Sequence, residues 1–199
     1  MIAMNVGSSS IRFAAYQAGD PPLRQLNGKV TGVGSPKTAL TFEDPFRHEQ
    51  DSRGIGALDH RSAAHYLIDW LDERHALSSV AAVGHRIVSG GADYRAPQLI
   101  TPKMLDELRR ISVYAPEHLP FEIALIDLLR ERVPGLTQFA CFDTALHRTA
   151  EESARSVRLV ACLDERLCRS TRTAREWELA RELDRSEQSR TEDARGRIR

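Results

Sequence analysis

A glycine- and serine-rich stretch near the N-terminus has the residue types that bind phosphate. The apolar run over residues 2–4 predicts a strand, Gly7 with Ser8, Ser9 and Ser10 predicts a tight turn, and the alternating residues 11–15 predict a second strand. Backbone N–H groups and hydroxyls at such a turn can surround phosphate oxygens. Asn5 adds a side-chain oxygen and Arg12 a fixed positive charge. An ordinary hairpin with a polar turn has the same composition, so the turn alone leaves both interpretations open.

Two later apolar segments each lead to a charged side chain. The run Val80–Val88, bounded by Gly90-Gly91, predicts a buried central strand whose far end carries His85 and Arg86. The run Thr137–Phe142 predicts another short buried strand, and Asp143 follows it directly. Open α/β sheets bind their ligands outside the carboxyl ends of the strands. Asp143 is therefore predicted at an edge where a ligand would bind.

Four segments, taken in order, resemble the acetate kinase family. Met4–Phe13 is similar to that family's phosphate loop, whose usual form is Asn-Ala-Gly-Ser-Ser-Ser-Leu-Lys. Val83-Gly84-His85-Arg86-Ile87-Val88-Ser89-Gly90-Gly91, Ala115-Pro116-Glu117-His118-Leu119-Pro120 and Cys141-Phe142-Asp143-Thr144-Ala145-Leu146-His147 match three further motifs. The resemblance covers about residues 1–150, and four matches in the family's order make it specific.

The resemblance implies transfer of a phosphoryl group from ATP to acetate, which gives ADP and acetyl phosphate. By this likeness Asp143 is the catalytic residue, Arg86 and His118 bind the carboxylate substrate, Ser8, Ser10 and Arg12 bind the phosphates of ATP, and Asn5 lies near the metal, Mg²⁺ or Mn²⁺. Such a reaction depends on alignment and on neutralising phosphate charge more than on covalent chemistry. A guanidinium can hold a carboxylate through two parallel hydrogen bonds, which suits Arg86 to that task. Members of the family are homodimers, which this chain need not be.

Two positions depart from the family's usual residues. Arg12 stands where lysine is typical, so the charge is kept while a planar fork replaces a point charge. Ser89 stands where a histidine often follows the arginine segment, which bears on the shape of the acyl pocket.

Composition excludes several other classes of protein. The chain has 199 residues, 28 basic and 28 acidic, so its formal net charge is zero and a nucleic-acid partner is not expected. No apolar stretch has the length of a membrane span, and the N-terminus lacks the pattern of a signal peptide. The three cysteines have no metal-binding spacing, which predicts free thiols in a reducing cytoplasm.

The remaining elements predict an α/β domain. Strands are expected at Leu26–Val33 and Ala39–Phe42, with a turn at residues 34–36 and a surface loop over residues 43–56. Helical spacing predicts a helix within Asp59–Ala76, where His60, His65 and His75 are expected to be solvated or at an edge. Thr101-Pro102 and Pro120 predict two further helix starts, and Pro134-Gly135 predicts a helix stop. With the resemblance, this order implies a ribonuclease-H-like half-unit of the actin, sugar-kinase and acetate-kinase superfamily, a mixed sheet flanked by helices.

The composition changes after residue 150. Of residues 151–199, 23 are charged and 12 of these are arginine, and apolar residues are too sparse after Cys168 to define a helix face. We therefore expect an acetate-kinase-like domain at 1–150 and a charged helical or disordered tail at 151–199, unlike the family. The family's next motif, Tyr-Gly-x-His-Gly-x-Ser, does not follow Asp143. This predicts a truncated chain, inactive alone, whose end reads like a shifted frame.

Three functions remain open. The first is an acetate kinase, the second a non-catalytic remnant that binds a small anion or a partner, and the third a propionate or butyrate kinase. The sequence does not separate acetate from propionate, because one methylene changes binding by only about 1–3 kcal/mol.

Overall fold

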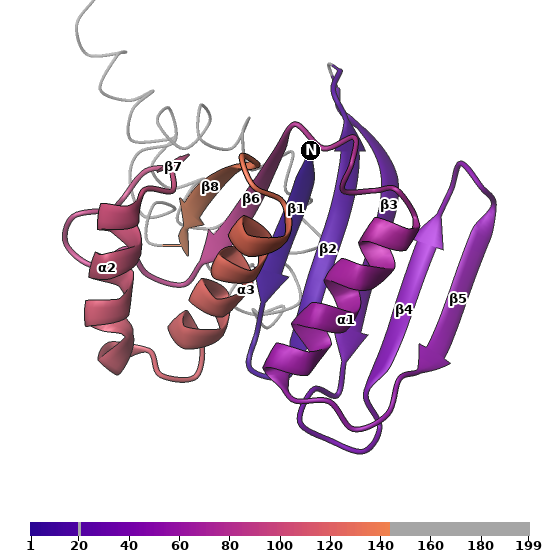
Figure 1. Ribbon diagram of the computed structural model, residues 1–199, viewed down its shortest axis with the longest axis horizontal. Coiled ribbons are helices and arrows are strands. Elements are labelled where there is room, and N and C mark those ends of the chain that lie inside the picture. The colour runs from indigo at the N-terminus through magenta and orange to yellow at the C-terminus, as the bar shows by residue number, and fades with distance from the viewer. Residues whose placement is uncertain (20, 144–199) are drawn as a thin grey trace, which may run out of the picture.

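A computed structural model describes residues 1–19 and 21–143, and these residues form one mixed sheet with helices packed against it (Figure 1). The strands, in the sheet order β5-β4-β3-β2-β1-β6-β8-β7, are β1 (Ile2–Val6), β2 (Ser10–Gln17), β3 (Leu23–Thr31), β4 (Ala39–Asp44), β5 (Glu49–Gly54), β6 (Ala82–Ile87), β7 (Gln98–Leu99) and β8 (Thr137–Phe142). The helices are α1 (His60–Glu73), α2 (Pro102–Ile111), α3 (Leu119–Arg132) and the short 3₁₀ turn η1 (Ser112–Tyr114). The predicted α/β class with a mixed sheet is confirmed.

The topology brings three carboxyl ends to one edge of the sheet. β1 to β5 form an antiparallel meander, whereas β6 runs parallel to β1 and β8 runs parallel to β6. A parallel neighbour needs a crossover, and α1 and α3 supply the two crossovers into β6 and β8. The ends of β1, β6 and β8 therefore lie side by side, and so do the residues that these strands carry there.

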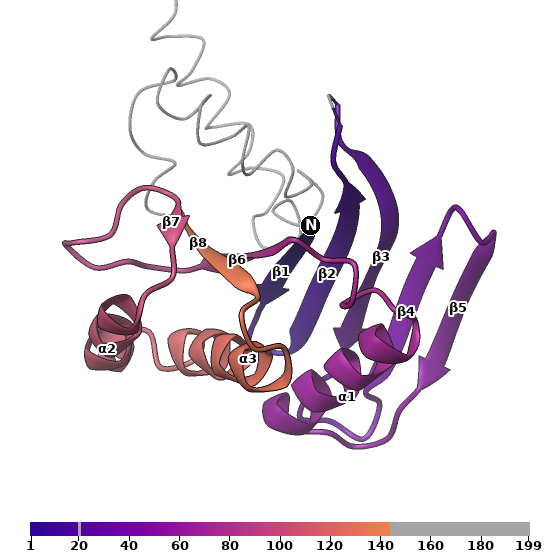
Figure 2. The same ribbon diagram turned by 45° about the horizontal axis from the view of Figure 1, so that its top comes forward.

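The three α-helices of the described residues lie on one face of the sheet (Figure 2). Strand alternation sends Ile2, Met4, Phe13 and Leu40 to that face, where they pack with Leu67 and other residues of α1. A second apolar cluster lies under α2 and α3. The opposite face carries Asn5 and Arg12, which oppose each other in the β1–β2 register. Burial of the apolar face is what fixes the register, because a slip of one residue would exchange the two faces.

The helix boundaries follow the predicted start and stop signals. Asp59 accepts a hydrogen bond from the Ser62 amide at 2.8 Å, and Thr101 accepts one from the Met104 amide at 3.2 Å. Each of these bonds satisfies an amide that has no partner inside the helix. α3 begins at Leu119 with a proline in its first turn, and Gly135 adopts φ 85° just beyond its end. The starts at Thr101-Pro102 and near Pro120 are confirmed, as is the stop at Pro134-Gly135.

Three parts of the strand prediction differ from the structure. β3 begins at Leu23, earlier than expected, and ends at Thr31, so Val33 belongs to the following turn. The surface loop predicted over residues 43–56 is wrong, because it contains β5. Every side chain of β5 is exposed, so the apolar alternation that would reveal a strand is absent. The two-residue β7 was not predicted either.

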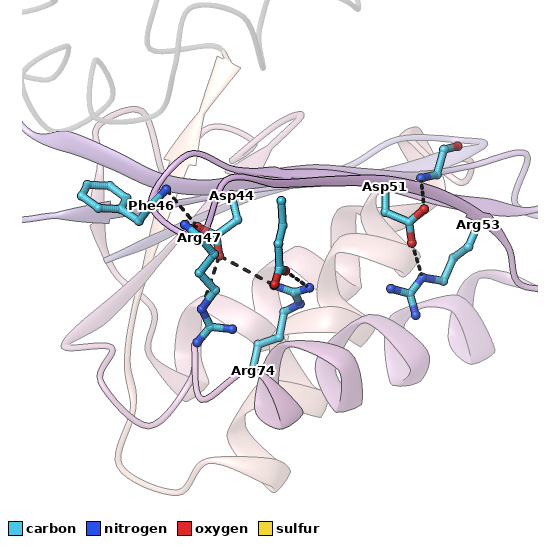
Figure 3. A network of polar contacts seen from close by, with 8 residues as sticks. Asp44, Phe46, Arg47, Asp51, Arg53 and Arg74 are labelled. Atoms are coloured by element: carbon cyan, nitrogen blue, oxygen red, sulfur yellow. Dashed lines mark hydrogen bonds and ion pairs between the residues drawn. The ribbon is translucent and has the colours of Figure 1, made fainter.

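An arginine from α1 holds the edge hairpin of β4 and β5 against the domain (Figure 3). Arg74 pairs with Asp44 at 3.6 Å and with Glu49 at 2.7 Å. Its guanidinium also lies over the rings of Phe42 and Trp70, at 4.3 and 4.7 Å from their centroids. This cluster explains how a strand with no buried side chain keeps its place at the edge.

No helix in residues 1–19 and 21–143 is long and apolar enough to span a membrane. The predicted tail at 151–199, with the last residues of the predicted domain, lies outside the described residues.

Candidate functional site

The glycine–serine turn between β1 and β2 is closed by its own backbone and fixed by neighbours. The Gly7 amide donates to the Ser10 carbonyl at 2.8 Å, and the Val33 amide donates to the Ser9 carbonyl at 3.1 Å. Ser8 and Ser9 are exposed and Ser10 is partly so. The predicted strand–turn–strand is confirmed, and its serines are accessible to a ligand at the edge of the sheet.

Arg86 lies at the centre of a polar cluster that joins three strand ends. Its Nε donates to Asp143 Oδ1 at 3.0 Å and its Nη2 to Asp143 Oδ2, so the carboxylate is held by two parallel bonds. Its Nη1 donates to Asn5 Oδ1 at 3.2 Å. The side chains of Arg86 and Asp143 are 17% and 28% exposed, so the cluster is accessible from solvent. Asn5, Arg86 and Asp143, predicted at separate strand ends, thus meet at one point.

Arg12 adds a second guanidinium on the same face. It opposes Asn5 in the β1–β2 register, and Ser10 shares its face because both lie two residues apart on β2. Partial burial, and then the positive charge of Arg86, lower the pKa of Arg12. Two guanidiniums that repel each other are stabilised by an anion placed between them. The arrangement therefore favours a ligand with negatively charged oxygens.

The strand that carries Arg86 sends its neighbour His85 to the other face. His85 is 2% exposed and its Nε2 lies 2.7 Å from Gln138 Oε1. Burial lowers the pKa of His85 to about 4, so the ring is neutral at neutral pH. The prediction that the end of this strand presents His85 together with Arg86 is therefore wrong, because adjacent residues of a strand point to opposite faces.

His118 immediately precedes α3 and is partly buried. Its Nδ1 is buried and has no hydrogen-bond partner among the described residues. Within residues 1–19 and 21–143, no hydrogen bond or ion pair joins it to Arg86 or Asp143. Its position at the carboxyl end of the parallel strands is set by α3, whose Glu122 side chain bonds the backbone just after β6. A buried nitrogen without a partner is suited to bind a ligand atom.

Glu122 and His60 are residues that the sequence did not single out for the site. Glu122 is 1% exposed and accepts the Val88 amide at 3.2 Å, two residues after Arg86. Burial raises the pKa of its carboxyl to about 8. Glu122 is the one acidic residue among the buried, otherwise apolar residues of α3, and this pattern could have identified it from the sequence. His60 was expected at a solvated or edge position, but its Nε2 lies 3.2 Å from the Gly7 carbonyl and its ring stacks on Phe121 at 3.7 Å.

The oxygens of Asn5 and Asp143 fit a magnesium ion chemically. Mg²⁺ is commonly held by one or two carboxylates together with waters and substrate phosphates. No group of three His, Cys, Asp or Glu residues among the described residues could enclose a metal by itself. Cys141 neighbours Arg86 in the sheet, but burial raises the pKa of its thiol to about 12, which excludes it as a nucleophile at neutral pH.

Comparison with known proteins identifies the family of this sequence. The sequence profile of the acetokinase family matches residues 1–167. Acetate kinase of Rhodopseudomonas palustris is 33% identical over 157 residues, which make up 77% of this chain and 39% of that protein. Acetate kinase of Deinococcus radiodurans is 35% identical over 153 residues, with 77% and 38% covered. The chain thus spans about two fifths of the length of these relatives.

Solved structures give the same result for the fold. A propionate kinase from Francisella tularensis superposes with a TM-score of 0.65 at 28% identity, covering 74% of this chain and 38% of that one. Acetate kinase of Porphyromonas gingivalis superposes with a TM-score of 0.64 at 25% identity, covering 73% and 37%. In each case the match covers less than two fifths of the larger protein.

Proposed function

Because the chain belongs to the acetokinase family, we propose that it takes part in phosphoryl transfer from ATP to a small carboxylate, with acetate as the substrate. The observation that carries the proposal is the Arg86 cluster. Arg86 is held between Asn5 and Asp143, beside a second guanidinium at Arg12. The Arg86 guanidinium can bind one anion through two N–H groups, and the neighbouring Gly7–Ser10 turn can bind a second.

We assign the individual roles as follows. Arg86 holds the substrate carboxylate, with His118 at the side of the pocket. Ser8, Ser10 and Arg12 contact the phosphates of ATP. Asp143 orients the attacking oxygen, and because a carboxylate is already ionised near neutral pH, it need not remove a proton.

Asn5 and Asp143 would hold the magnesium ion, since their oxygens are the ones at the end of β1 and after β8 that can bind it. The ion would neutralise phosphate charge and align the phosphoryl group. Of the chain's own residues, Arg86 supplies a positive charge beside the phosphoryl group, and its two bonds to Asp143 orient that carboxylate. The assignment of Mn²⁺ in place of Mg²⁺ needs no change of these residues.

Acetate is proposed as the acceptor, and propionate or butyrate is the alternative. Both an acetate kinase and a propionate kinase superpose on the described residues. Ser89, which replaces a histidine typical of the family, lies next to Gly90, where even one added carbon would meet the Tyr94 carbonyl oxygen at 2.0 Å. The loop after β6 is thus closely packed at Gly90, and the Ser89 hydroxyl accepts the Gly91 amide at 3.2 Å.

Anion binding without turnover is the second candidate function. It is favoured by the same guanidinium pair, because Arg12 and Arg86 can bind an oxyanion whether or not a reaction follows.

One pair of measurements tests both candidates. Titration of the 199-residue chain with acetate and with inorganic phosphate, followed by amide NMR, should shift the signals of Asn5, Arg86 and the Gly7–Ser10 turn. Hydroxamate trapping of acetyl phosphate with magnesium and ATP then distinguishes turnover from binding alone. Absence of any shift at these amides would contradict both functions.

A further inference from the structure

The two halves of the proposed site, the phosphate half at the Gly7–Ser10 turn and the arginine half at Arg86, come from different elements. The turn belongs to the β1–β2 hairpin, whereas Arg86 belongs to β6. β1 and β6 are paired at Ile2, Ala3 and Met4, and beyond that pairing Arg86 Nη1 donates to Asn5 Oδ1 at 3.2 Å. The Gly7–Ser10 turn follows Asn5 and takes no part in this pairing, so contacts from another element contribute to its position relative to Arg86.

The first turn of α3 contacts the phosphate half through His60. The Phe121 ring stacks on the His60 ring, with 3.7 Å between centroids and 10° between planes. The His60 Nε2 lies 3.2 Å from the Gly7 carbonyl oxygen. A carbonyl only accepts, so Nε2 carries the proton and donates it. His60 thereby connects the glycine–serine turn to the start of both α1 and α3.

The next residue of α3 contacts the arginine half. Glu122 accepts the Val88 amide through both oxygens, at 3.3 and 3.2 Å, and is 1% exposed. Val88 directly follows the last residue of β6, so this bond fixes the strand end that carries Arg86. Consecutive residues of one helical turn thus reach the two halves of the site.

We propose that the first turn of α3 sets the spacing of the site, with His60 positioning the Gly7–Ser10 turn and Glu122 positioning the end of β6 behind Arg86. This inference rests on the proposed function, in which the phosphate bound at the Gly7–Ser10 turn and the carboxylate bound at Arg86 must meet, so the distance between these two parts matters. Neither residue touches the reacting groups in it, so both are positioning residues and act through the backbone of Gly7 and of Val88.

The charged groups around Glu122 demand a control for electrostatics. Arg86 and Asp143 both act on its carboxyl through their charges, and the Val88 amide bonds it. Replacement by glutamine removes the ionisable carboxyl, and with it any negative charge gained as the pH rises, and keeps a carbonyl that can accept the Val88 amide. Replacement by leucine removes both. The two variants therefore separate the hydrogen bond from the charge.

The equivalent pair at position 60 separates donation from packing. In His60→Gln, the amide can still donate to the Gly7 carbonyl. In His60→Leu, apolar contact with Phe121 remains and the donor is lost. A groove of about 640 Å³ adjoins His60 and Phe121, so both side chains can be accommodated. His65→Leu on α1 and Glu131→Leu on α3 are matched controls, because both residues line the same groove far from the two backbone contacts.

The experiment uses the full 199-residue chain, with acetate and inorganic phosphate as probes in amide NMR titrations, and amide hydrogen exchange without ligand. His60→Leu should weaken phosphate binding by about five- to tenfold, the effect of one hydrogen bond, and leave acetate binding within about twofold. Glu122→Leu should weaken acetate binding by the same factor and leave phosphate binding within about twofold. Without ligand, exchange should accelerate at Gly7 in the first variant and at Val88 in the second. Both glutamine variants should restore the wild-type values.

Several outcomes would overturn the inference. Leucine variants that leave both affinities and both amides unchanged would do so, as would equal losses for both ligands. A Glu122→Gln variant as impaired as Glu122→Leu would show that charge, and not position, is what matters. Wild-type protein that binds neither probe would refute the proposed function instead, and hydrogen exchange at Gly7 and Val88 would still decide the inference.

Discussion

Arg86 uses three of its five N–H groups within the described protein. Nε and Nη2 bond Asp143, and Nη1 bonds Asn5. One N–H on each terminal nitrogen therefore remains for a substrate carboxylate, which is the number that a two-pronged contact requires. The guanidinium is held in place before the substrate arrives, so less side-chain entropy is lost on binding.

We expect Arg86→Ala to abolish carboxylate binding and to leave the fold intact. The substitution removes the N–H groups that donate to acetate. Because the Arg86–Asp143 ion pair is accessible to solvent, its loss should lower the free energy of unfolding by only about 1 kcal/mol. NMR titration with acetate and thermal unfolding measure the two effects. Arg86→Lys should bind with at least about tenfold lower affinity, because an ammonium cannot form two parallel bonds. Arg110→Ala, which removes an ion pair with Glu107 at the surface, is the control. Unchanged acetate affinity in Arg86→Ala would disprove the proposed role of Arg86 in binding the carboxylate.

The raised pKa of Glu122 predicts a pH-dependent stability. The folded carboxyl keeps its proton up to a pH of about 8, whereas the unfolded one loses it near its ordinary value of 4.5. The folded state then binds more protons between these values, so this group lowers the free energy of unfolding as pH rises, by up to about 1.4 kcal/mol per pH unit. When the free energy of unfolding is measured in urea between pH 5 and pH 8, its decline with rising pH should therefore be smaller for Glu122→Gln than for wild type. Equal slopes in the two proteins would refute the prediction.

Residue patterns in the sequence predicted the polar cluster around Arg86 better than the residues that position it. Apolar runs placed Asn5, Arg86 and Asp143 at or near strand ends, the resemblance supplied their expected roles, and the carboxyl ends of parallel strands meet at one edge. Glu122 and His60 were not found, because their contacts are to backbone atoms of residues 34 and 53 positions away. Side-chain chemistry can be read along the chain, but which distant carbonyl or amide it reaches depends on the packing of helices on the sheet.

At the scale of elements, the hairpin of β4 and β5 shows where hydrophobic patterning fails. All six residues of β5 are exposed, so the strand is specified by pairing with β4 and by charges rather than by burial. Arg74, directly after α1, supplies the charge through its ion pairs to Asp44 and Glu49 (Figure 3). Its guanidinium also lies over the rings of Phe42 and Trp70. Polar contacts of this kind also protect an edge strand from pairing with another chain.

We expect Arg74→Ala to destabilise the protein by about 2 kcal/mol, because it removes two ion pairs and two cation–π contacts at a largely buried position. Hydrogen exchange should accelerate in β5 more than in β1 or β6. Arg53→Ala is the matched control, since Arg53 also lies over Phe42 and pairs with Asp51 but is exposed. Its cost should stay below about 0.5 kcal/mol. Equal effects of the two substitutions would show that burial of Arg74 contributes nothing.

At the scale of the whole molecule, the site lies at one edge of a sheet whose helices, among the described residues, all lie on one face (Figure 2). The related kinases contain more than half of their length outside the region that matches this chain. Phosphoryl transfer is favoured when the reacting groups are enclosed, because expelling water strengthens the electrostatic contacts to the transferring group. In the proposed function, the described residues supply the carboxylate clamp and the phosphate turn, and enclosure of the reacting groups requires further atoms on the open side, the face of the sheet opposite the described helices.

We therefore expect the polypeptide of residues 1–199, assayed alone, to bind acetate and phosphate but to form acetyl phosphate only very slowly. Closure over the phosphates completes the catalytic arrangement in enzymes of this kind, and a missing transition-state arginine can cost about 10³-fold or more in rate. Hydroxamate trapping with magnesium, ATP and acetate measures the product, with the Rhodopseudomonas palustris acetate kinase as positive control and Asp143→Asn as negative control. Robust turnover that Asp143→Asn abolishes would contradict the expectation. It would mean that residues 144–199, or a second copy of the chain, complete the site on its open side.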